Sequence, residues 1–103
     1  MITIDDKNYE LKYNIQRIGL IEAATGTSVM ATMQKNGGML SINEYELYFA
    51  YALKEEGSEL FVTPKKGMEL AEKHLLEKGY AEAVAYVLEA IQRDCPFFFQ
   101  AAL

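Results

Sequence analysis

Among the residue types that catalysis or metal binding most often uses, two occur only once in this sequence: His74, the only histidine, and Cys95, the only cysteine. A metal site needs several His, Cys or carboxylate ligands that converge, and a general base needs a nucleophile within reach. The neighbours of His74 along the chain are Glu72, Lys73 and Glu77, which form no such set. We therefore expect His74 to face solvent on a helix, and the sequence predicts no catalytic residue and no metal site.

Cys95 and the glycine pair Gly37-Gly38 also lack the surroundings that chemistry requires. No Cys-x-x-Cys pair or basic neighbourhood lowers the pKa of Cys95, so we expect it to act as a small hydrophobic residue at a helix end. The glycine pair is not followed by the Gly-Lys-Ser/Thr of a phosphate-binding loop, and it predicts a turn. These patterns favour a protein that is not an enzyme and holds no cofactor.

Two groups of apolar residues are candidates for binding a partner instead. Methionines cluster in the least regular part of the chain, where flexible thioethers suit a surface that accepts varied apolar helices; filling an irregular core would explain them about equally well. Three phenylalanines follow Pro96, and successive side chains cannot all point one way, so we expect burial to use one or two rings and to leave at least one for a contact. The six candidates are Met30, Met33, Met39, Phe97, Phe98 and Phe99.

The elements that would position these residues indicate an α+β fold that is mainly helical. Apolar residues alternate near the N-terminus, which predicts a β-hairpin over about 1–13 with a turn at Asp5 to Asn8. Apolar spacings of three and four residues then predict a bundle of about five helices. Their ranges are about 15–24, 28–35, 42–54, 64–78 and 80–94.

Helix-start and helix-stop residues support these boundaries. Asn14 is a predicted N-cap, Ser41 and Glu44 match a capping box, and Thr63 precedes a proline that suits the first helical position. We expect the helix at 80–94 to be central and to pack its apolar face on the helix at 42–54. The run Leu60 to Val62 either adds a strand to the hairpin or anchors a loop, and the sequence does not decide between these.

The composition sets wider bounds on the function. The chain has 103 residues, which predicts one domain over 1–103, and half of them are hydrophobic, as in a folded protein. A formal net charge of −5 argues against nucleic acid or an anionic membrane as the main partner. No apolar run reaches the length of about 20 residues that a membrane helix needs, and no secretion signal is visible, so we expect a cytoplasmic protein.

Several stretches together resemble one known family. The hairpin Ile4 to Asn14 runs into the segment Ile18 to Ser28, the helix Tyr45 to Leu53 and the Thr63-Pro64 helix start follow, and Cys95-Pro96-Phe97-Phe98 stands near the end. This pattern is similar to the small tail assembly chaperones of long-tailed phages and prophages of Gram-positive bacteria. The resemblance covers nearly the whole chain, but it rests on apolar patches and their spacing.

The resemblance implies a non-enzymatic protein that binds the tape-measure protein and keeps it soluble during tail assembly in the bacterial host cytoplasm. It also implies a possible longer form of the chain produced by ribosomal frameshifting, and we expect self-association into a homo-oligomer. Two alternatives stay open: a structural or connector protein retained in the phage tail, and a small regulatory subunit of a bacterial operon.

Overall fold

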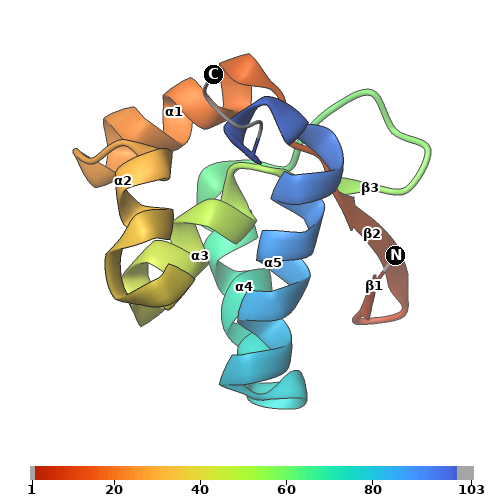
Figure 1. The fold of residues 1–103 in the computed structure, drawn as a ribbon. Coiled ribbons are helices and arrows are strands. Elements are labelled where there is room, and N and C mark those ends of the chain that lie inside the picture. Colours follow the sequence, from red (N-terminus) through yellow and green to blue (C-terminus); the bar gives the residue numbers. More distant parts are fainter. Residues whose placement is uncertain (1, 100–103) are drawn as a thin grey trace.

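Three short strands and five α-helices make up the computed structural model, which describes residues 2–99, with only the backbone described at Asn36 and Phe99. The strands lie at one side of the helices, and the first two helices lie at the other (Figure 1). The α+β, mainly helical fold predicted from the sequence is confirmed. The elements are β1 (Ile2–Ile4), β2 (Lys7–Leu11), α1 (Ile15–Thr25), α2 (Val29–Gln34), the 3₁₀ helix η1 (Lys35–Gly38), α3 (Ile42–Ala50), β3 (Leu53–Glu55), α4 (Pro64–Lys78), α5 (Tyr80–Asp94) and the 3₁₀ helix η2 (Pro96–Phe99).

The sheet is antiparallel in the order β1-β2-β3, with Ile2 opposite Tyr9 and Leu11 opposite Leu53. Asp5 and Asp6 have φ angles of 52° and 66°, so they form the two-residue turn of the hairpin. The predicted turn was too long, since Lys7 and Asn8 already pair in β2.

The third strand was not predicted, because the helix expected over 42–54 ends at Ala50. At Ala52 the backbone N–H donates to the carbonyl of Phe49, and the carbonyl of Ala52 accepts from the N–H of Lys12. Leu53 and Lys54, which were predicted to be helical, therefore pair with β2 as part of a strand. The run Leu60 to Val62 forms no strand of its own, and Phe61 makes a single bridge to Lys54.

The predicted helix starts are correct. The Asn14 side chain accepts a hydrogen bond from the Arg17 N–H, and the Thr63 hydroxyl accepts one from the Lys66 N–H. Ser41 and Glu44 form both bonds of the capping box, at 3.0 Å and 2.7 Å. The structure also places Glu22 at the start of α2, where its carboxylate accepts from the Val29 N–H at 2.8 Å.

The core lies between the sheet, α3, α4 and α5. α3 supplies three of the four largest fully buried side chains, Tyr45, Tyr48 and Phe49, and the fourth is Tyr13. Ala52 and Leu53 join the core from the turn and strand that follow α3. α5 buries a continuous stripe formed by Ala83, Val84, Val87, Ala90 and Ile91. α3 contacts both α4 and α5. The packing of the helix at 80–94 on the helix that begins at residue 42, which was predicted from the sequence, is therefore present.

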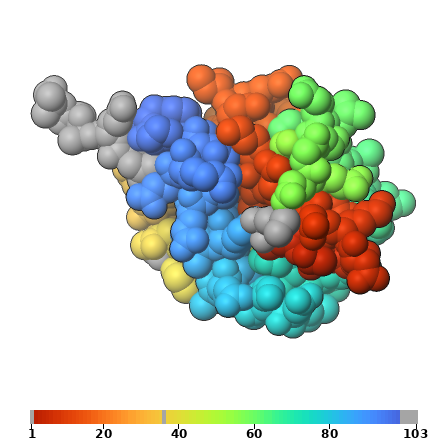
Figure 2. Space-filling view, turned by 90° about the vertical axis from the view of Figure 1, so that its right-hand side faces the viewer, coloured from red at the N-terminus to blue at the C-terminus, as the bar shows by residue number. Residues whose placement is uncertain are grey.

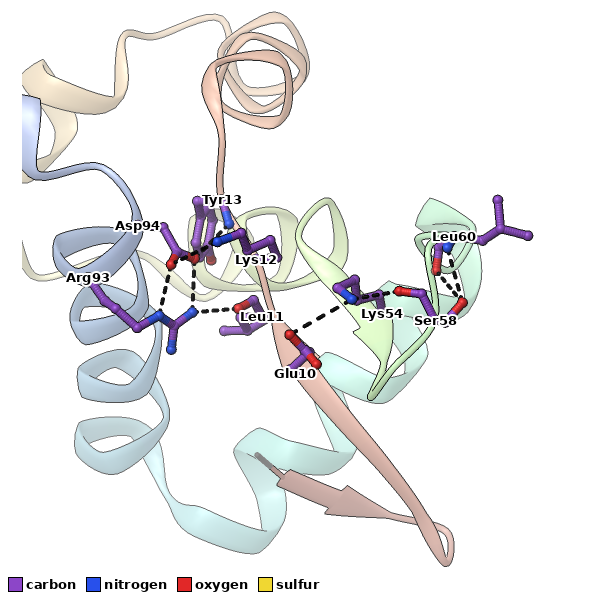
Figure 3. A network of polar contacts seen from close by, with 9 residues as sticks. All are labelled: Glu10, Leu11, Lys12, Tyr13, Lys54, Ser58, Leu60, Arg93 and Asp94. Atoms are coloured by element: carbon purple, nitrogen blue, oxygen red, sulfur yellow. Dashed lines mark hydrogen bonds and ion pairs between the residues drawn. The ribbon is translucent and has the colours of Figure 1, made fainter.

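A polar network fixes the end of α5 against the end of β2 (Figure 3). The Asp94 carboxylate, only 4% exposed, accepts a hydrogen bond from the Tyr13 N–H at 3.0 Å, and Arg93 donates to the Leu11 carbonyl at 2.7 Å. Burial alone would raise the pKa of Asp94, but hydrogen bonds from Arg93 and Tyr13 outweigh it and lower that pKa. α5 is therefore held at its C-terminal end as well as along its buried stripe.

Gly67 is the point of closest approach between α4 and α3. A Cβ atom added at Gly67 would lie 2.7 Å from the Ala50 Cα and 2.8 Å from the Ala50 carbonyl oxygen, so the backbones would have to separate. We expect Gly67→Ala to lower the free energy of unfolding by about 1–3 kcal/mol, the usual cost of overpacking, measured by urea denaturation.

Gly19→Ala is the matched control, because Gly19 is also inside a helix but has no atom within 4 Å of an added Cβ. Alanine favours the helix over glycine, so this variant should be more stable than the wild type by about 0.5–1 kcal/mol. Equal effects of the two substitutions would contradict the close packing of α3 on α4.

Candidate functional site

Two apolar hollows lie side by side between η1 and α5, with volumes of about 210 Å³ and 230 Å³. They share Gly37, Gly38 and Leu88, and we call them together the α5–η1 groove. The first is also lined by Met33 and Gln92, and the second by Met39, Tyr80, Ala81, Val84 and Ala85. In Figure 2 the blue surface of α5 lies between the red surface of the hairpin and the yellow surface around residue 40.

The wall opposite α5 depends on backbone conformations that favour glycine. Gly37 and Gly38 have φ angles of 65° and 85°, which side-chain-bearing residues rarely adopt. A Cβ added at Gly38 would lie 3.6 Å from the Leu88 Cδ1, an ordinary contact distance, so the backbone conformation rather than lack of space favours glycine there. Beyond the glycines, the Tyr80 hydroxyl donates to the Leu40 carbonyl at 2.5 Å. The segment is thus fastened to the start of α5, and the groove has a defined shape.

The groove brings together two of the three methionines predicted to bind a partner. Met33 is half-buried and packs against the core, while Met39 is 58% exposed. Met30, on α2, is half-buried and does not line either hollow. The other wall comes from α5, where Ala81, Ala85 and Leu88 recur at helical spacing, and this row was not predicted as a binding surface from the sequence.

Phe97 and Phe98 are not among the residues that line the two hollows. Phe98 is half-buried and packs against the core, and its ring centroid is 4.7 Å from that of Phe97, which is 46% exposed. The side chain of Phe99, the third predicted contact residue, lies outside the described structure. The six candidate residues therefore form no single cluster in the part of the chain that is described.

His74 was expected to face solvent, and this prediction is wrong, because the residue is only 4% exposed. Its Nδ1 lies 2.9 Å from the Tyr45 hydroxyl, and its ring stacks on Phe49 with centroids 5.2 Å apart. Gly67, Leu70, Ala71 and His74 form the buried face of α4, whereas Leu76 on the same helix is 77% exposed. The helical spacing of these residues is visible in the sequence. His74 was nevertheless expected to face solvent because its side chain is polar.

Cys95 is fully buried, as expected of a small hydrophobic residue, and burial raises the pKa of its thiol. Within residues 2–99, no group of three or more His, Cys, Asp or Glu side chains is placed to hold a metal ion. None of the described helices is long and apolar enough to cross a membrane. The candidate residues that the structure does bring together are the apolar ones of the α5–η1 groove. They favour binding of another apolar surface.

Comparison with protein families, curated proteins and solved structures found no match to this chain. The function must therefore be argued from the groove and from the sequence pattern.

The buried position of His74 predicts a pH-dependent stability. Burial, the largest cause, lowers the pKa of His74 below its ordinary value of 6.5; Lys78 lowers it further, and Glu77 and Glu82 raise it by smaller amounts. Tyr45 and Tyr86 also face the ring from α3 and α5. As the pH falls below 6.5, the unfolded chain takes up the proton first, so stability is lost until the pH reaches the lower pKa of the folded state.

We expect the free energy of unfolding, measured with urea at pH 7.5 and pH 5.5, to fall more for the wild type than for His74→Gln. Glutamine has no charge change in this range, and the carboxylates that also titrate are the same in both proteins. If the two proteins lose the same stability between these pH values, His74 is not held neutral by the fold.

Proposed function

We propose that this chain is a non-enzymatic assembly chaperone of a phage or prophage tail, which binds the tape-measure protein through the α5–η1 groove and keeps it soluble in the host cytoplasm. The observation that carries this proposal is an open apolar groove on a chain whose formal net charge is −5. An exposed apolar hollow with polar surroundings is typical of a binding site for another protein. The resemblance of the sequence to the tail assembly chaperones supplies the identity of the client.

The groove suits an amphipathic helix, the form in which a long helical client would present its apolar residues. Alanines at 81 and 85 allow a second helix to approach the α5 backbone closely, and Leu88, Met33 and Met39 surround that row. Methionine side chains adapt to different apolar partners, which favours a client that offers several similar segments. Phe97, exposed beyond the end of α5, is a second contact in this proposal, either to the client, to another copy of the chain or to a frameshifted longer form.

Co-expression with the tape-measure protein tests this proposal. The wild-type chain should raise the soluble fraction of the client and elute in complex with it. Ala85→Glu should weaken the complex by at least about tenfold, because binding would bury an unpaired carboxylate in an apolar groove. The measurements are the soluble client fraction and the dissociation constant for a soluble client fragment.

Ala23→Glu is the matched control, because Ala23 is likewise an exposed alanine within a helix, on α1. Both variants should keep the thermal unfolding temperature of the wild type, so that a difference between them reports on binding. A client that stays equally insoluble with and without the wild-type chain would show that the chaperone proposal is wrong. If both substitutions weaken the complex equally, the α5–η1 groove is not the binding site for the client.

A further inference from the structure

A hollow of about 400 Å³, which has charged side chains in its lining, lies on a different side of α5 from the groove, and we call it the His74 pocket. On α5 it is lined by Glu82 and Tyr86, whereas the groove is lined by Ala81 and Ala85; one residue along an α-helix turns by about 100°. The complete lining is Ile2, Thr3, His74, Glu77, Lys78, Glu82 and Tyr86, contributed by β1, α4 and α5.

The contacts of the Tyr45 hydroxyl favour one of the two neutral forms of the His74 ring. The Tyr45 hydroxyl donates to the Ala71 carbonyl at 3.1 Å and lies 2.9 Å from the His74 Nδ1. A hydroxyl has one proton, so both contacts are hydrogen bonds only if Nδ1 carries a hydrogen and donates it to the Tyr45 oxygen. The neutral ring then has a lone pair on Nε2, the nitrogen left for the pocket.

The His74 side chain is more than nine-tenths buried, and no described residue donates a hydrogen bond to its Nε2, which is open to the pocket. A ligand in the pocket could therefore donate a hydrogen bond to this nitrogen. The charges at the opening favour a cationic donor. Lys78 lies 3.7 Å from Glu77 and offsets its charge, while Glu82 has no ion pair within the described residues, so the lining carries one net negative charge.

We propose that the His74 pocket binds a guanidinium group, the head of an arginine side chain. A guanidinium has five N–H donors in a rigid plane, which allows it to serve the imidazole Nε2 and the Glu82 carboxylate together. The Tyr86 ring, whose centroid is 5.6 Å from that of His74, offers a face for the flat cation. An ammonium ion has neither the planar fork nor the stacking surface. The site does not depend on the identity of the partner in the groove.

Nitrogen NMR of protein labelled with ¹⁵N-histidine tests this directly, because the chain has one histidine and each ring nitrogen gives one signal. Before ligand is added, the signals should report hydrogen on Nδ1. Titration with L-arginine at constant ionic strength should then shift the Nε2 signal to saturation. Citrulline, which has nearly the same shape without the charge, should produce no saturable shift.

Glu82→Gln should weaken arginine binding by about fivefold, the range for an exposed charged contact. Glu89→Gln is the matched control, since Glu89 is an exposed glutamate of the same helix outside the pocket lining, and it should bind as the wild type does. Glu82 is itself exposed, so its replacement leaves the core intact. Arginine that fails to saturate the Nε2 shift, citrulline that binds equally, or equal weakening by both variants would overturn the proposal.

A blocked arginine, acetylated at its amino group and amidated at its carboxyl group, distinguishes the two sources of the guanidinium. Affinity equal to that of free arginine means that the side chain is sufficient, as required for an arginine of a protein partner. Binding of the free amino acid alone means that the pocket holds a small molecule. Both results support a guanidinium site and assign its ligand.

Discussion

The end of α3 is the constraint on which the rest of the fold depends, because a helix leaves its last carbonyl groups without helical partners. Here, side chains and backbone from the N-terminal part of the chain satisfy them. The Tyr13 hydroxyl donates to the Tyr48 carbonyl at 2.9 Å, Arg17 to the Tyr51 carbonyl at 3.3 Å, and the Lys12 N–H to the Ala52 carbonyl at 2.9 Å. The same turn sends the chain into β3. One helix end therefore determines the positions of the sheet and of α1.

The exposed faces of α5 follow from this arrangement. Asp94 accepts the Tyr13 N–H, and Tyr13 is in turn bound to the end of α3, so the C-terminal end of α5 is fixed by the same region. With its buried stripe turned toward the core, α5 presents Ala81 and Ala85 on one flank and Glu82 and Tyr86 on another. η1 covers part of the first flank and α4 borders the second. Both proposed sites are thus consequences of how α5 is docked.

Local signals in the sequence predicted the helices well, because caps and breakers act over a few residues. Asn14, Ser41 and Thr63 all mark helix starts that the structure contains. β3 was missed because its formation depends on β2, more than 40 residues earlier, and an apolar residue such as Leu53 fits either a helix or a strand. The environment of His74 was missed for the same reason, since its partner Tyr45 belongs to another helix. Met33 and Met39 of the groove were predicted as contact residues from their residue type. The α5 wall opposite them was not predicted.

The composition of the α5 wall explains how an acidic chain can carry an open apolar groove at a small cost in free energy. An exposed alanine leaves little apolar area in water, so the row on α5 costs less than leucines would in the same places. The larger groups, Leu88 and Met33, are half-buried and already pack against the core, and among the larger side chains of the groove Met39 is the one mostly exposed. A helix bound in the groove would bury a modest apolar area, through contacts with the small alanine side chains and with the adaptable methionine side chains. Such a surface favours reversible binding, which the proposed chaperone function would require.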